Sequence, residues 1–278
     1  MNASSSSTNV KPSDTSPLRI AGFGACLITG YPLEGAGMFE VACRLVEKRL
    51  SRPVQSKIVS LGGFPAPRAA KYLKKVFGFD PQYIIFQFGA TDAQCPIRAG
   101  NRPTDRSTEL GTVSKSKPSG AASSYHRKPA TVLSPLRWEI ASLIGSLRKI
   151  EPITPLSSYI ATIEHMVDDC RSQGITPVVL SPFAYGSRYT TRKATSYVDA
   201  LNELNSKAQG MIFVDCFSLL ADFPKSRILQ HDGFHLSRLG QNLVGQAIAQ
   251  AMVANILANG LIGNARSNRL AEAMVYGL

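Results

Sequence analysis

A carboxylate and an imidazole stand three positions apart near the C-terminal end of the chain, at Asp232 and His235. They directly precede a segment whose apolar residues have helical spacing, so both fall in a turn. At this spacing the carboxylate can accept a hydrogen bond from Nδ1–H of the ring, which fixes the tautomer and leaves Nε2 free as a general base. The alternative is an ordinary capping aspartate followed by a histidine at the rim of the fold.

The chain offers few other histidines for this role. His126 lies in a tract of low complexity, and His165 falls on a predicted helix over residues 157–172, where a satisfied or solvent-facing histidine is the default. The candidates for a catalytic base are therefore His231 and His235, and only His235 has the carboxylate placed to orient it.

A cysteine follows the first apolar run of the sequence. Cys26 lies in GFGACLITG, where a predicted strand ends and a turn begins between Gly24 and Gly30. A thiol at such a turn points at backbone N–H groups, which favour the nucleophilic thiolate. The alternative for Cys26 alone is a small buried hydrophobic side chain. The odd number of cysteines and the absence of CxxC pairs predict reduced thiols rather than a disulfide or zinc framework, the other four being Cys43, Cys95, Cys170 and Cys216.

Two further loops could supply hydrogen-bond donors to a developing negative charge. The segment SLGGFPAPR follows the second apolar run and contains Gly62 and Gly63, and FGATDAQ follows the third and contains Thr91 and Asp92. Backbone N–H groups and a hydroxyl here could stabilise an oxyanion. These glycine patterns match neither GxGxxG, nor the lysine-containing phosphate loop, nor GxSxG, so nucleotide binding is not supported and we expect no cofactor. The cysteine pattern likewise leads us to expect no bound metal.

The elements that would position these groups alternate along the chain. Short apolar runs predict strands at 18–24, 54–60, 83–89, 176–181 and 211–215, and helical spacing predicts helices over 38–49, 160–170 and 236–251. This order predicts an α/β fold, a three-layer α/β/α sandwich around a five-stranded parallel sheet with flavodoxin-like strand order 2-1-3-4-5. Ligands bind at the carboxyl ends of such strands, the edge where the candidate residues gather.

Length and composition limit the remaining classes. The 278 residues, 44% hydrophobic and 18% charged, fit one globular core with insertions. The most apolar stretch, residues 244–262, is interrupted by glutamines and asparagines, so we expect no membrane span. Residues 1–17 read as a disordered polar tail without a secretory signal, which predicts a cytoplasmic protein.

The net charge of +12 is concentrated in one part of the sequence. Residues 96–150 hold ten Lys and Arg against three acids, a net +7, in a Ser/Lys/Gly/Pro-rich context. We interpret 93–155 as a basic, lid-like insertion within a domain of residues 18–257, followed by a C-terminal extension over 258–278. Because the tract lacks interleaved aromatic residues, we expect solvated or substrate-facing charge and no nucleic-acid partner.

Taken together, these blocks resemble the SGNH (GDSL-like) hydrolase family, and the resemblance covers nearly all of 18–257 outside the insertion. The family's Gly-Asp-Ser block lies over residues 24–30, its second-block glycine over Gly62, its Gly-x-Asn-Asp block over residues 89–92, and its Asp-x-x-His block over residues 232–235. The tract YIATIEHMVDDCRSQGITPVVLSPF also looks like the family's fourth helix and strand. Two departures are plain: Ala25-Cys26 stands for the family's Asp-Ser, and Thr91 for the asparagine of the third block.

The resemblance implies hydrolysis of a small-molecule acyl ester or thioester through a covalent acyl-enzyme. Cys26 would be the nucleophile, with His235 and Asp232 as the other two members of the triad, and the oxyanion hole would combine the backbone N–H of Cys26 and Gly62 with the Thr91 hydroxyl. Because a thioester is a better acyl donor than an oxyester, an acyltransferase is an alternative. A degenerate protein that binds a ligand without turnover is another, given the changes at positions 25, 26 and 91.

Overall fold

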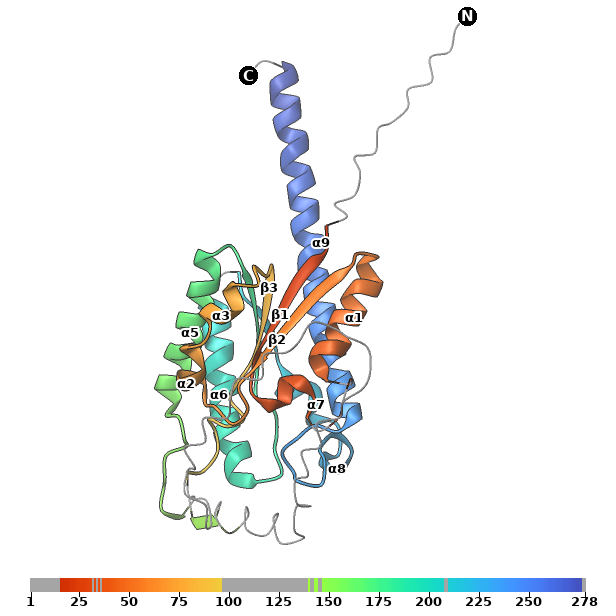
Figure 1. The fold of residues 1–278 in the computed structure, drawn as a ribbon. Coiled ribbons are helices and arrows are strands. Elements are labelled where there is room, and N and C mark those ends of the chain that lie inside the picture. The colour runs from red at the N-terminus through yellow and green to blue at the C-terminus, as the bar shows by residue number, and fades with distance from the viewer. Residues whose placement is uncertain are drawn as a thin grey trace, which may run out of the picture.

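The computed structural model describes residues 16–31, 33, 35, 37–96, 140, 143, 144, 147–207 and 210–276, with the backbone alone over 260–276. Most of the predicted N-terminal tail and residues 97–139 of the predicted lid-like insertion lie outside the described residues, as does His126. The described part forms one α/β unit (Figure 1).

Five strands of the described chain form a single parallel sheet. Its order is β2-β1-β3-β4-β5, which confirms the predicted flavodoxin-like arrangement. The strands are β1 (Leu18–Gly24), β2 (Val54–Ser60), β3 (Tyr83–Gln87), β4 (Thr176–Leu180) and β5 (Ile212–Val214). Each lies within its predicted range, and the last three are shorter than predicted by one or two residues.

Burial explains why these segments are strands. Every residue of β3 is buried, and all but Arg19 of β1, so a continuous apolar run suits positions covered on both faces. The edge strand β2 is partly exposed along its length and carries Gln55, Ser56 and Lys57. A polar edge of this kind discourages pairing with another chain.

Helices cover both faces of the sheet, giving the predicted three layers (Figure 1). On one side lie α1 (Met38–Leu50), α7 (Cys216–Ala221), α8 (Lys225–Ile228) and α9 (Arg238–Tyr276). On the other lie α2 (Ala66–Ala70), α3 (Lys74–Phe77), α5 (Leu156–Ser172) and α6 (Arg188–Lys207). Between β1 and α1 the chain forms the short 3-10 turn η1 (Cys26–Thr29).

The C-terminal helix is longer than the sequence pattern predicts. The predicted helix over 236–251 lies mostly within α9, but α9 continues to Tyr276 and so crosses the predicted boundary at residue 258 without a break. Figure 1 shows its last turns projecting beyond the sheet. No helix in the described part of the chain combines the length and apolar character needed to cross a membrane.

The carboxyl end of β1 is hydrogen-bonded to both neighbouring strands, β2 and β3. Gly24 pairs in register with Ser60 of β2 and Gln87 of β3. Its carbonyl accepts a hydrogen bond from Leu61 N at 2.8 Å, and the next residue, Ala25, donates from its backbone N to Gln87 O at 3.2 Å. The loops that follow β1, β2 and β3 therefore begin side by side.

The loops can begin side by side because residue 24 is a glycine and has no side chain. This gives a first prediction. A Cβ at Gly24 would lie 2.6 Å from Gln87 O, a backbone atom that cannot move aside cheaply. Gly24→Ala should therefore lower the free energy of unfolding by about 1–3 kcal/mol, measured by chemical denaturation.

Gly78 is the matched control. A Cβ there would meet only Lys75 O at 3.9 Å, and its φ of −62° suits any residue. Gly78→Ala should change the free energy of unfolding by at most about 1 kcal/mol. Equal effects of the two substitutions would show that the close approach at Gly24 does not constrain the sheet edge.

Candidate active site

Cys26 is the first residue of η1, directly after β1. The turn is held by Thr29 Oγ1, which donates to Cys26 O at 2.8 Å, and by Gly30, whose positive φ of 76° ends it while its N donates to Leu27 O. Among the five cysteines, all of which the structure describes, Cys26 is half-buried and the other four are buried. Cys26 is therefore the most accessible of the five residues.

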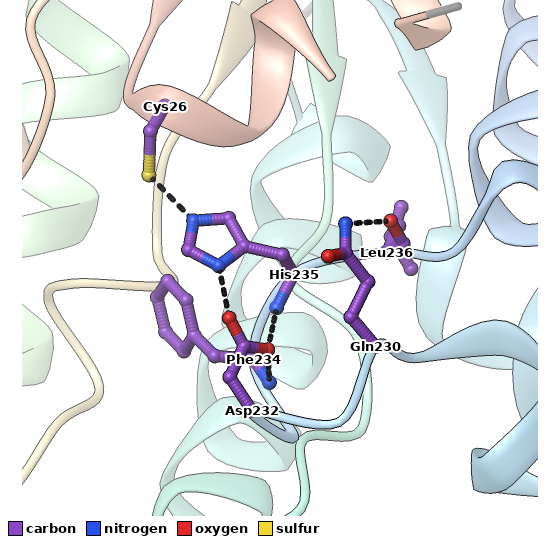
Figure 2. A network of polar contacts seen from close by, with 6 residues as sticks. All are labelled: Cys26, Gln230, Asp232, Phe234, His235 and Leu236. Atoms are coloured by element: carbon purple, nitrogen blue, oxygen red, sulfur yellow. Dashed lines mark hydrogen bonds and ion pairs between the residues drawn. The ribbon is translucent and has the colours of Figure 1, made fainter. Parts of the chain in front are cut away.

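The Asp232 carboxylate is oriented by its own loop. Oδ1 accepts hydrogen bonds from Phe234 N and His235 N, both at 2.9 Å. Oδ2 is left to accept from His235 Nδ1 at 2.6 Å. One carboxylate thus fixes the turn and the imidazole together, which explains why the spacing of three residues suffices (Figure 2).

The imidazole reaches from this loop to the turn after β1. His235 Nε2 lies 3.3 Å from Cys26 Sγ, although the two residues are 209 positions apart in the sequence. Figure 2 shows sulfur, imidazole and carboxylate in one line. Because Nδ1 is engaged by Asp232, Nε2 is the ring nitrogen that faces the sulfur.

The contacts between these residues shift the pKa of Asp232 and of His235 in opposite directions. Burial raises the pKa of Asp232, but its hydrogen bonds from His235 and the backbone outweigh burial and lower it to about 2. Burial lowers the pKa of His235, while its contacts with Asp232 and Cys26 dominate and raise it to about 9. At neutral pH the ring is therefore an imidazolium held between a carboxylate and a sulfur atom.

A loop after β4 supports the turn that carries Asp232 and His235. Gly186 N donates to Gly233 O at 2.7 Å, and the Tyr185 ring stacks on Phe234 with centroids 5.4 Å apart. Gly233 has a φ of 66°, a conformation that a side chain would strain. Gln230 also holds this turn, because its backbone N donates to His235 O. Its side-chain Nε2 donates to Leu236 O (Figure 2).

The two other predicted oxyanion donors lie on the neighbouring loops. Gly62 is exposed and follows Leu61, whose N bonds Gly24 O, and Ser60 Oγ donates to Ala25 O at 3.2 Å. Thr91 is buried in the loop that follows β3. Both residues therefore belong to the sheet edge that carries Cys26, as the strand order predicts.

Some residues of the site have no signal in the sequence. The Tyr31 and Phe234 rings both lie edge-on to His235, with centroids 5.2 Å from it. An aromatic residue beside a histidine forms no recognisable motif, and Phe234 is identified only by its place within the Asp-x-x-His turn. Of the other candidates, His231 and His165 are exposed, and His165 lies beside Asp169 on α5.

The comparisons place the fold among known enzymes. No protein-family model matches the sequence, and no curated protein matches it significantly. The structure is similar to a lipase/acylhydrolase from Enterococcus faecalis, with a TM-score of 0.56, 16% identity and coverage of 86% of this chain and 96% of that one. It is also similar to an acetylxylan esterase from Geobacillus stearothermophilus, with a TM-score of 0.55, 11% identity and coverage of 85% and 95%.

A third similar structure is described as a lipolytic protein of the G-D-S-L family, from Desulfitobacterium hafniense DCB-2. Its TM-score is 0.52 at 13% identity, and the match covers 84% of this chain and 98% of that one. These neighbours are lipolytic and ester-cleaving hydrolases of the kind that the sequence resembles. At such low identity they establish the shared α/β/α fold.

The exposure of Cys26 generates a second prediction. Limiting iodoacetamide should alkylate Cys26 about tenfold or more faster than the other cysteines, because burial raises the pKa of Cys43 and Cys170 to about 12 and shields all four. Peptide mapping by mass spectrometry measures this, with the denatured chain as the control in which all five react. Labelling of any other cysteine with Cys26 untouched would contradict the assignment.

The third prediction concerns stability and pH. The pKa of His235 rises from 6.5 to about 9 on folding, so its interactions stabilise fully below pH 6.5 and are lost as pH rises through about 9. The Asp232 contribution is present above pH 3.8 and is lost as pH falls through about 2. His235→Gln should therefore lower Tm more at about pH 5.5, where the contribution of the charged ring is complete, than at about pH 10, where it is lost.

His165→Gln provides the control for this measurement. His165 is exposed on α5 and lies 3.7 Å from Asp169, so it has a carboxylate neighbour without burial. Its substitution should leave Tm nearly unchanged at both pH values. A Tm difference for His235→Gln that does not vary with pH would show that the charge on the ring does not stabilise the fold.

Proposed function

We propose that this chain hydrolyses carboxylic esters or thioesters through a covalent acyl-enzyme formed on Cys26. The proposal is carried by one observation: Cys26 Sγ, His235 and Asp232 lie in line, with contacts of 3.3 Å and 2.6 Å. This is the order of nucleophile, base and orienting carboxylate that acyl transfer requires.

In the first half-reaction, the sulfur attacks the carbonyl carbon of the substrate. In the reactive form that we propose, His235 Nε2 carries a proton, which the raised pKa of the ring favours at neutral pH, and the sulfur attacks as the thiolate. As the carbon–sulfur bond forms, the π electrons of the carbonyl move to its oxygen. When the carbon–oxygen bond of the ester breaks, the leaving oxygen takes the proton from Nε2 and departs as the alcohol.

In the second half-reaction, neutral His235 takes a proton from water, and the resulting hydroxide oxygen attacks the S-acyl carbon. The carbon–sulfur bond breaks, the electron pair returns to sulfur, and the carboxylic acid leaves. Asp232 keeps Nδ1–H in place throughout and stabilises the imidazolium whenever it forms. The site then again carries one proton on Nε2, which now comes from water.

The oxyanion of both tetrahedral intermediates needs donors at the sheet edge. We assign this role to the backbone N–H of Cys26, the backbone N–H of Gly62 and the hydroxyl of Thr91. Their loops begin side by side because Gly24 is paired with both β2 and β3. A threonine hydroxyl has one proton to donate and a short reach, so we expect Thr91 to contribute less than a longer amide side chain.

The structural neighbours support this chemistry. The acetylxylan esterase of Geobacillus stearothermophilus has catalytic mutants in which a serine and a histidine are each replaced by alanine. An esterase from Pseudoalteromonas with the same fold is inhibited by monoethylphosphonate, a reagent that resembles the tetrahedral intermediate of ester hydrolysis. In this chain the nucleophile of the proposal is a cysteine, which makes the acyl intermediate a thioester.

The fourth prediction tests the proposal by substitution at the nucleophile. Incubation with short-chain nitrophenyl esters and acyl thioesters should add one acyl mass to Cys26, detected by intact-mass spectrometry and peptide mapping. Cys26→Ala should not be acylated and should not turn over ester, whereas Cys26→Ser should retain hydrolysis, since His235 can activate a hydroxyl in the same place. Equal nonzero rates for the parent and Cys26→Ala would exclude catalysis by this residue.

Asp232→Asn should lower the rate by about 10⁴-fold, because the amide no longer selects the tautomer with Nε2 facing sulfur. Asp169→Asn is its matched control, since Asp169 lies beside the exposed His165. An acyltransferase would behave differently: Cys26→Ser would lose transfer to an amine or alcohol while hydrolysis survived. A protein that only binds its ligand would show no acylation in any variant.

A further inference from the structure

We propose that Asp92 is a positioning residue that holds the loops of Gly62 and Thr91 in place against Cys26. The inference rests on the proposed function, since it concerns the donors that the oxyanion would meet. Asp92 directly follows Thr91, and its side chain is completely buried. It lies outside the line formed by Cys26, His235 and Asp232, so the triad itself does not explain why a carboxylate is buried here.

Three donors from three separate segments converge on this carboxylate. Oδ1 accepts from Ala66 N and from Thr154 Oγ1, both at 2.8 Å, and Oδ2 accepts from Gly89 N at 2.9 Å. Three donors and no acceptor match an ionised carboxylate, which accepts only. Burial raises the pKa of Asp92, while these hydrogen bonds oppose the rise and favour the charged form.

Two of these donors belong to the loops that carry the proposed oxyanion donors. Ala66 is the first residue of α2 and closes the loop that contains Gly62, which is anchored at its other end by the bond from Leu61 N to Gly24 O. Gly89 opens the loop that contains Thr91 and has a φ of 98°, a conformation available to glycine. The Asp92 carboxylate therefore bridges the loops after β2 and β3 directly.

The third donor brings in the segment that precedes α5. Thr154 N donates to Asp92 O at 3.1 Å, and Ile153 N donates to Gln94 O at 2.9 Å. The Tyr197 hydroxyl of α6 donates to the Thr154 carbonyl and lies 3.4 Å from Asp92 O. These contacts join the two ends of the predicted insertion, residues 93–155, beside Thr91 and fix the Asp92 backbone as well as its side chain.

A site of this kind needs donors placed within about 0.5 Å of their working positions. A Cβ built on Gly62 would meet nothing within 4 Å, so no neighbour packs against this residue, and the anchors at the two ends of its loop help to fix its position together with the bond from Phe64 N to Leu61 O. Loss of the Asp92 anchor should therefore shift the oxyanion donors while leaving Sγ and Nε2 in contact, because His235 is held by Asp232 and by the loop after β4. The position of the oxyanion donors and the nucleophilicity of Cys26 can therefore be measured separately.

The fifth prediction uses two reactions of the same sulfur. Alkylation by iodoacetamide requires the thiolate but no oxyanion donor, whereas acylation by 4-nitrophenyl acetate requires both. In Asp92→Asn and Thr154→Val, the rate of Cys26 acylation should fall about 10- to 10²-fold, with the loss in kcat and not in KM. The rate of Cys26 alkylation should stay at the parent value.

Two further variants complete the design. Thr154→Ser keeps the hydroxyl donor and should restore acylation, and Thr162→Val is the control, because Thr162 Oγ1 on the exposed face of α5 bonds only its own helix at Ser158 O. Thr154→Val retains the carboxylate and its two backbone donors, so it decides the question even where Asp92→Asn does not fold.

The outcomes distinguish this inference from the function on which it rests. If the parent is never acylated on Cys26, the proposed function fails and this assignment fails with it. If the parent is acylated and both Asp92→Asn and Thr154→Val match it, the assignment alone is wrong. An equal fall in alkylation and acylation would also overturn it, since Asp92 would then support the whole fold rather than the oxyanion loops.

Discussion

The parallel pairing of β1 with β2 and β3 is the constraint on which the site depends. All strands point the same way, so their carboxyl ends meet at one edge, and Gly24 allows the loops that leave this edge to start in contact. Cys26 follows two residues later, and the loops of Gly62 and Thr91 begin beside it. Residues from distant parts of the sequence are thereby gathered at one edge of the sheet.

Much of this arrangement could be predicted from the sequence because it depends on local signals. Strands buried on both faces appear as unbroken apolar runs, and Asp232 and His235 are close enough in sequence for one turn to pair them. Helix α6 was not predicted, since its buried face includes Tyr189, Thr190 and Tyr197, whose hydroxyls weaken the apolar periodicity. The partners of Asp92 could not be predicted either, because Ala66 and Thr154 are 26 and 62 positions away.

Two carboxylates of the site illustrate how environment divides their tasks. Asp232 is partly exposed. One of its oxygens accepts hydrogen bonds from its own turn and the other accepts from an imidazolium, so its pKa falls to about 2. Asp92 is fully buried and receives only neutral donors, so burial dominates and its pKa rises. The first is suited to stabilise a charge that appears during the reaction, and the second to hold backbone in place.

Asp92 also lies at the base of the segment inserted after β3. The backbone pairs of Ile153 with Gln94 and of Thr154 with Asp92 close the base of residues 93–155 against the core. The entropic cost of closing a loop grows only slowly with its length. The number of residues in this segment therefore has little effect on the stability of the strands beside it. The backbone of Asp92, next to Thr91, is therefore held by this closed base whatever the number of residues in the segment.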